Sequence, residues 1–169
     1  MNSKHFIIGI IVAFFFCSCG DGKVDDVTIQ MDRETFESEK ASWIGEDLKN
    51  YQFTYEYSKG STAPVGPVKI IIREDEEPII VNQNLYNDYI VAENISEIYN
   101  LITDDFDYME SIKNGTNHVS NIRSVTMDIT YNNQYHYPIK VSMSTEYNGE
   151  PIDGGGFTNL KIIGFVILD

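Results

Sequence analysis

Hydrophobic and polar residues recur along the chain with two different periods, and these periods predict the order of helices and strands. A helical period predicts a first helix over about residues 33–49, capped by Asp32, and a second from residue 94 or 96 to about residue 112. Asn114 and Gly115 suit a left-handed cap at the end of the second helix. The apolar faces consist of Phe36, Trp43, Ile44 and Leu48 in the first helix, and of Ile95, Ile98, Tyr99, Ile102, Phe106, Met109 and Ile112 in the second.

Alternation with a period of two predicts three strands after each helix. The expected strands are residues 51–58, 68–72, 78–82, 124–131, 139–143 and 157–168. Short turns join consecutive strands, which favours antiparallel pairing. We therefore expect a single α+β domain over residues 31–169. In this domain two helix-plus-three-strand units form an antiparallel sheet with both helices packed on one face, and the other face stays open for recognition.

Aromatic residues are concentrated at alternate positions of the first expected strand. Tyr51, Phe53, Tyr55 and Tyr57 could form a stacking platform for sugars or peptides, or the core face against the helices. We favour the core face for this row. Exposure is expected instead near the second hairpin, so the candidate ligand-binding residues are Tyr131, Tyr135 and Tyr137.

The N-terminal segment predicts export and lipidation. Lys4 precedes an apolar run over residues 6–16, which is long enough for a signal peptide and too short to span a bilayer. The following residues resemble a lipobox, in which the small residue Ser18 stands before the acceptor Cys19. Residues 1–18 are thus expected to be cleaved, and lipid such as palmitate on Cys19 is expected to anchor the protein in a membrane.

Charge and composition narrow the location and the partners. Residues 19–30 are polar and contain two glycines, so we expect a flexible tether. The net charge is −14, and it becomes −15 when cleavage of the leader removes Lys4, because the leader contains no Asp or Glu. Nucleic acid is excluded as a partner, since phosphate binding needs clustered Lys and Arg. The expected location is the bacterial cell envelope, periplasmic or at the outer surface, with a protein or glycan as the possible partner.

No sequence motif identifies catalysis, and no cofactor or metal is expected. The mature chain keeps no cysteine apart from Cys19, and we interpret His118 and His136 as surface or turn residues. Acidic residues are abundant, but no pattern selects a catalytic pair of the glycosidase type. We interpret Asp104, Asp105 and Asp107 as a solvated face of the second helix. Asp153 lies in a glycine-rich loop that turn chemistry explains better than calcium binding.

Several short phrases resemble a family of uncharacterised bacterial lipoproteins, the domain of unknown function 6174 group. They are Trp43, residues 48–55, residues 66–70, Tyr131 and residues 137–139. The resemblance spans about residues 43–157, and it implies an extracytoplasmic lipid-anchored module without implying an activity. Relatives place cysteines in the loop between the first two strands, whereas residues 59–67 contain none here.

Three functional hypotheses follow from the sequence. We prefer a non-enzymatic binding or interaction module, because the chain combines an anchor with one compact domain and an open sheet. The first alternative is an inhibitor of a secreted hydrolase that uses the loop of residues 59–67, by loose fold analogy. The second is a hydrolase that uses paired carboxylates, which requires two acids to converge in a pocket.

Overall fold

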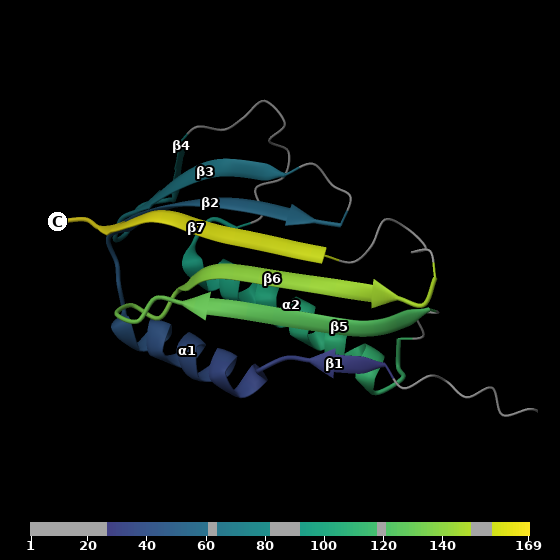
Figure 1. Cartoon of the computed structure of the whole chain (residues 1–169). Helices are drawn as coiled ribbons and strands as arrows, with labels where there is room; N and C mark the ends of the chain where they lie inside the picture. Colours follow the sequence, from purple (N-terminus) through teal and green to yellow (C-terminus); the bar gives the residue numbers. More distant parts are fainter. Residues whose placement is uncertain (1–26, 61–63, 82–91, 118–120, 150–156) are drawn as a thin grey trace, which may run out of the picture.

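In the residues that it describes, the computed structural model places two helices and seven strands in one layered unit (Figure 1). It describes residues 27–60, 64–81, 92–117, 121–149 and 157–169. Cys19, His118 and Asp153 lie outside these residues. In chain order the elements are β1 (Thr28–Gln30), α1 (Arg33–Glu46), β2 (Tyr51–Lys59), β3 (Val65–Ile72), β4 (Ile79–Val81), α2 (Ile95–Lys113), β5 (Ile122–Tyr131), β6 (Pro138–Tyr147) and β7 (Phe157–Ile167).

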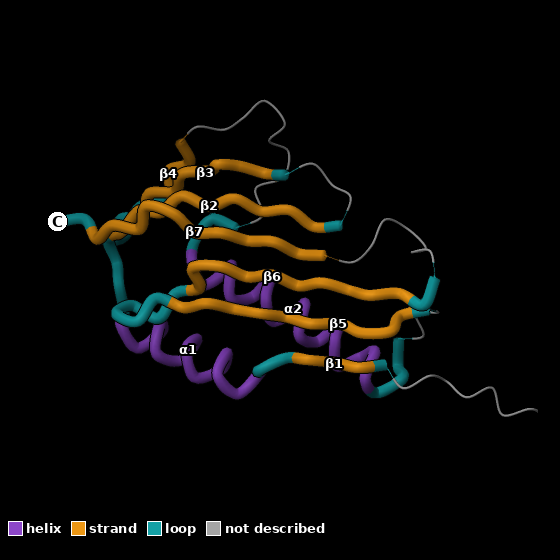
Figure 2. The backbone as a smooth tube through the Cα atoms, viewed as in Figure 1, coloured by secondary structure: helices purple, strands orange, loops and turns teal. Residues whose placement is uncertain are grey.

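All seven strands belong to one sheet with the order β1-β5-β6-β7-β2-β3-β4 (Figure 2). The α+β class predicted from the sequence is confirmed. The finer prediction of two helix-plus-three-strand units in an antiparallel sheet is wrong. Because β7 pairs with both β6 and β2, the strands that follow the two helices merge into one layer. The sheet is also mixed, since β1 pairs with β5 in parallel.

Strand β1 lies in the segment for which the sequence predicts a flexible tether. Thr28 and Gln30 pair with Ser124 and Thr126 of β5, while Ile29 lies beside buried Val125. Three residues with a single apolar side chain give no recognisable alternation, so the long-range partner β5 determines this strand. Consequently, residues 28–30 belong to the sheet.

The helices begin where capping residues predict and end where the backbone turns left-handed. The Asp32 carboxylate accepts a 2.9 Å hydrogen bond from the Thr35 amide at the start of α1, as expected. This helix ends at Glu46, three residues before the predicted end, because Asp47 adopts a left-handed conformation with φ 46°. At the start of α2, the side chain of Asn94 accepts a hydrogen bond from the Glu97 amide.

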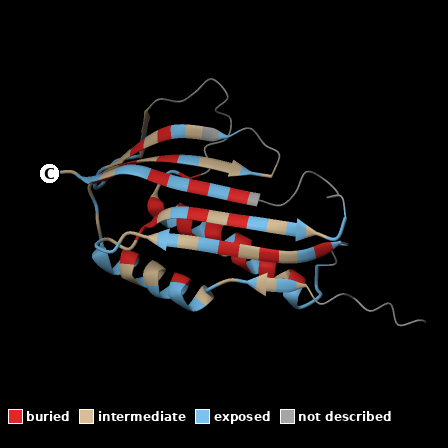
Figure 3. Cartoon of the chain, in the orientation of Figure 1, coloured by how far each residue is buried: buried red, intermediate tan, exposed pale blue. Residues whose placement is uncertain are grey.

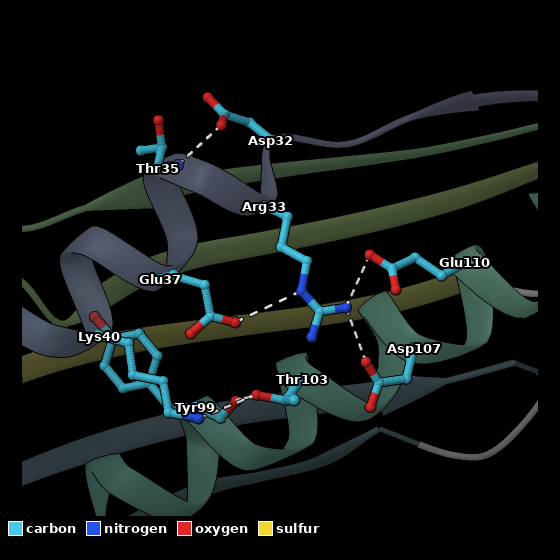
Figure 4. A network of polar contacts seen from close by, with 9 residues as sticks. All are labelled: Asp32, Arg33, Thr35, Glu37, Lys40, Tyr99, Thr103, Asp107 and Glu110. Atoms are coloured by element: carbon cyan, nitrogen blue, oxygen red, sulfur yellow. Dashed lines mark hydrogen bonds and ion pairs between the residues drawn. The ribbon is translucent and has the colours of Figure 1, made fainter.

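Both helices lie on one face of the sheet and form the core with its inner side chains (Figures 1 and 4). Phe36 of α1 packs against Phe106 and Tyr99 of α2, with ring centroids 4.7 and 5.7 Å apart. The aromatic row of β2 points into this core, as favoured from the sequence, with Tyr51, Phe53 and Tyr55 buried. The helical period predicts Ile44 on the apolar face of α1, but its exposed fraction is 62%, so this prediction is wrong.

A network of polar contacts joins the two helices at their outer surface (Figure 4). The guanidinium of Arg33 lies 2.8 Å from Asp107 and 3.0 Å from Glu110, both on α2, and 3.6 Å from Glu37 on its own helix. Since these side chains are partly exposed, each pair contributes little alone. Together they add polar contacts between α1 and α2 at the rim of the apolar contact made by Phe36.

Candidate functional site

The structure places two of the three candidate tyrosines on one ring, that of Phe165, and buries one of these two. Tyr137 is only 8% exposed, because its ring stacks on Phe165 of β7 at 4.4 Å. The prediction that it is exposed is wrong. Tyr135 is half-buried against the same ring at 5.6 Å. Tyr131 is also half-buried, but it lines a small cavity of about 60 Å³ between β5 and the start of α1.

The hairpin between β5 and β6 is fastened to both helices, which explains the position of its tyrosines. The Asn132 side chain accepts hydrogen bonds from the Gln134 and Tyr135 amides and so shapes the turn. His136 Nδ1 lies 2.9 Å from Glu39 of α1, and the His136 carbonyl accepts a hydrogen bond from the hydroxyl of Tyr99 in α2. These contacts assign His136 a positioning role that the sequence did not indicate.

Tyr99 and Tyr131 lie beside these hairpin contacts, and the pKa values of both hydroxyls are raised. Burial raises the pKa of Tyr99, and the neighbouring Tyr131 and Glu39 raise it further. Burial likewise raises the pKa of Tyr131, with Glu39 and Asp32 adding to the effect. Both hydroxyls therefore stay protonated in the folded protein at pH values where an exposed tyrosine ionises.

This difference predicts alkaline instability that depends on Tyr99. Above the ordinary tyrosine pKa of about 10, the unfolded chain releases the proton that the folded protein retains, so the free energy of unfolding falls as the pH rises. From pH 10 to pH 11 this tyrosine should account for a loss of about 1 kcal/mol. Urea unfolding at both pH values should show a loss in Tyr99→Phe that is smaller than the loss in the original chain by about this amount. Equal losses in the two proteins would contradict the prediction.

The outer face of the sheet is not covered by any described helix or loop (Figure 3). The inward residues Val141, Leu160 and Ile162 are buried, so Lys140, Asn159 and their neighbours point outward. Along β7 this face changes in character. The end of the face near the C-terminus of β7 carries exposed apolar side chains, namely Ile163 and Val166 of β7 and Ile79 of β4. The opposite end of the face is polar.

A shallow hollow of about 260 Å³ lies over the polar end of the outer face. Its outward side chains come from three neighbouring strands and from the segment before β3. They are Glu56 and Ser58 of β2, Lys140 of β6, Asn159 and Lys161 of β7, and Pro64. The sequence did not indicate this hollow, because its residues are separated along the chain and join only through the β6-β7-β2 pairing.

Two lysines stand directly opposite each other in the hollow. Lys140 pairs with Lys161 across β6 and β7, and Glu56 faces Lys161 across β2 and β7. Among the described residues, no ion pair involves Lys140, Lys161 or Glu56. Like charges at directly opposite positions destabilise a sheet. Two neighbouring positive charges suit an anionic group on a partner, even though the chain as a whole has a net charge of −14.

A second polar cluster lies on the inner face, where the sheet meets the middle of α2. Asp105 is only 3% exposed and lies 2.8 Å from the ammonium of Lys59, so the predicted solvated position is wrong for this residue. Burial alone would lower the pKa of Lys59, but the hydrogen bond and charge of Asp105 outweigh burial and raise it. Asp104 and Asp107 are exposed, as expected.

Further polar groups surround this ion pair. Burial raises the pKa values of Tyr57 and Tyr108, and the charge of Asp105 contributes to both shifts. The nearby strands carry two buried hydroxyls, those of Thr145 and Thr158, that have no hydrogen-bond partner in the described part of the chain. An unpaired buried hydroxyl costs about 1–3 kcal/mol. At this end of the described core, the hydrogen bonding of the buried polar groups is thus less complete than elsewhere.

The described residues contain no group of three or more His, Cys, Asp or Glu side chains that could hold a metal ion. Nor does any described helix have the length and apolar character needed to cross a membrane. The buried acid Asp105 has a lysine as its partner, whereas paired-carboxylate hydrolysis requires a second acid.

Comparison with known proteins yields no match to a family model, a curated protein or a solved structure. The resemblance to the domain of unknown function 6174 group therefore rests on its short shared phrases, and membership stays a prediction.

Proposed function

We propose that the protein is a lipid-anchored binding module of the bacterial cell envelope, and that the outer face of its sheet is the binding surface. The observation that carries the proposal is the hollow beside Lys140 and Lys161, on a face that no described helix or loop covers. Charged and hydrogen-bonding side chains converge there without ion-pair partners of their own among the described residues. The neighbouring exposed apolar residues extend the surface, as is typical of interaction sites.

The buried groups support a structural role for the opposite face. Its aromatic residues form the core between the sheet and the helices, and its buried acid is held by Lys59. Because the inner face is filled by the helices, a large partner has access to the outer face instead. A leader and a lipidated Cys19 would present this face to partners within reach of a membrane.

The anchor is tested by metabolic labelling with palmitate in a bacterial host. The original chain should incorporate the label, and Cys19→Ser should not. Cys17→Ser provides the matched control, since Cys17 leaves with the leader and its replacement should keep the label. Labelling that persists in Cys19→Ser would refute lipidation at this residue.

The binding surface is tested by recovery of partners from envelope extracts. Asn159→Trp places a large side chain in the hollow, whereas Ala41→Trp places the same side chain on the exposed surface of α1. We expect Asn159→Trp to reduce recovery of a partner at least tenfold and Ala41→Trp to leave it unchanged. If no protein, glycan or lipid is recovered, or if both variants bind equally, the proposal fails.

A further inference from the structure

We propose that the hollow binds a carboxylate-bearing sugar, with the carboxylate held between Lys140 and Lys161. This inference rests on the proposed function, because it names the ligand of the same outer face. The hollow of about 260 Å³ is smaller than the roughly 300–1,000 Å³ of enclosed ligand pockets. It therefore suits one small group, such as a sugar ring at the end or along the length of a larger glycan.

The two lysines define the charge of the ligand. They are direct neighbours across β6 and β7, and no ion pair among the described residues neutralises either of them. A carboxylate between the two ammonium groups would accept a charge-assisted hydrogen bond from each and remove their mutual repulsion. The strongly acidic remainder of the surface disfavours long-range attraction of anions, so recognition depends on this local pair.

The remaining side chains favour hydroxyl groups on the ligand. Ser58 and Asn159 offer both donors and acceptors at the edge of the hollow, and Glu56 is an acceptor that sugar hydroxyls can satisfy. The same Glu56 favours a ligand that places a single carboxylate in the hollow, because it would repel a second negative charge held close to it. Protein interfaces also concentrate aromatic anchors at their centre. Tyr57, the aromatic residue among the described lining of the hollow, alternates with the outward residues Glu56 and Ser58 and so points to the inner face of the sheet.

The experiment measures binding of short acidic glycans to the full chain, expressed with its leader and purified in detergent. The probes are oligomers of galacturonate and of glucuronate, sialyllactose, a poly-glutamate peptide, and neutral oligomers of galactose and glucose. Titration calorimetry should show that at least one acidic probe binds and that the neutral sugars bind at least tenfold more weakly. Raising the salt concentration should weaken the acidic interaction.

Lysine variants locate the site. The double variant Lys140→Ala/Lys161→Ala should lower the affinity for the acidic probe at least tenfold. Lys69→Ala, which removes an outward lysine of β3 outside the hollow, should change the affinity less than twofold. Lys140→Gln/Lys161→Gln retains hydrogen bonding without charge and should lose affinity as the alanine variant does. Circular dichroism of each variant checks folding, and the glutamine pair keeps the test valid if the alanine pair unfolds.

Three results would overturn the inference: no acidic probe binds, neutral probes bind equally well, or a poly-glutamate peptide binds more tightly than every acidic sugar. These results are distinguishable from failure of the proposed function. If Asn159→Trp still abolishes recovery of the envelope partner, the outer face remains the binding surface and only the ligand class is wrong. If Asn159→Trp retains the partner, the proposed surface itself is wrong.

Discussion

Replacing Phe36 with alanine is expected to lower the free energy of unfolding by about 3–5 kcal/mol, as for other buried aromatic residues. The Phe36 side chain is fully buried and packs against two rings of α2, Tyr99 and Phe106. Its removal leaves a void between the helices that rigid aromatic neighbours cannot fill by small movements. Urea unfolding followed by circular dichroism measures the change.

Ile44→Ala in the same helix is the matched control. Both replacements remove a large apolar side chain from α1, but Ile44 is 62% exposed and should change the free energy of unfolding by no more than about 0.5 kcal/mol. Similar losses in the two variants would show that helix propensity, rather than burial between α1 and α2, governs the effect.

The contrast between these residues shows how far the hydrophobic pattern predicts the fold. Local spacing predicts both helices and six of the strands, because capping groups and alternation act over a few residues. It places Ile44 on the wrong side, since α1 covers only the margin of the sheet and buries just Phe36 and Trp43. A helix that packs along so narrow a stripe leaves neighbouring apolar positions in solvent.

Strand β1 and the merged sheet could not be predicted for a different reason. Both depend on pairing between residues far apart in the chain, such as Thr28 with Ser124 and Tyr51 with Ile167. Strand propensity reports only how well a residue fits a pleated surface, and the partner strand supplies the remaining information. Local patterns therefore indicate that strands exist without giving their order.

Dependence on long-range strand pairing also explains why the sequence does not predict the candidate site. Lys140 and Lys161 are 21 positions apart, and neither belongs to a recognisable motif. They become neighbours only through the register of β6 and β7, and Glu56 joins them through β2. The sequence pattern favours the tyrosines near the hairpin instead, because they are close in sequence, although packing on Phe165 buries Tyr137.

Replacing Lys59 with methionine is expected to lower the free energy of unfolding by about 3 kcal/mol, because it leaves Asp105 buried without its ammonium partner. The exposed half of Lys59 allows some water to reach the site, which places the effect at the lower end of the range for broken buried pairs.

Lys59→Met/Asp105→Leu removes both charges and should recover most of the loss, since an apolar pair of similar size needs no partner. Chemical unfolding of the single and double variants measures the two changes. A double variant as unstable as Lys59→Met would show that poor packing of the replacement side chains, rather than the stranded carboxylate, causes the loss. Recovery in the double variant would show that the charge pair at this end of the core is not required for folding. Its retention beside the unpaired hydroxyls of Thr145 and Thr158 would then need an explanation other than stability.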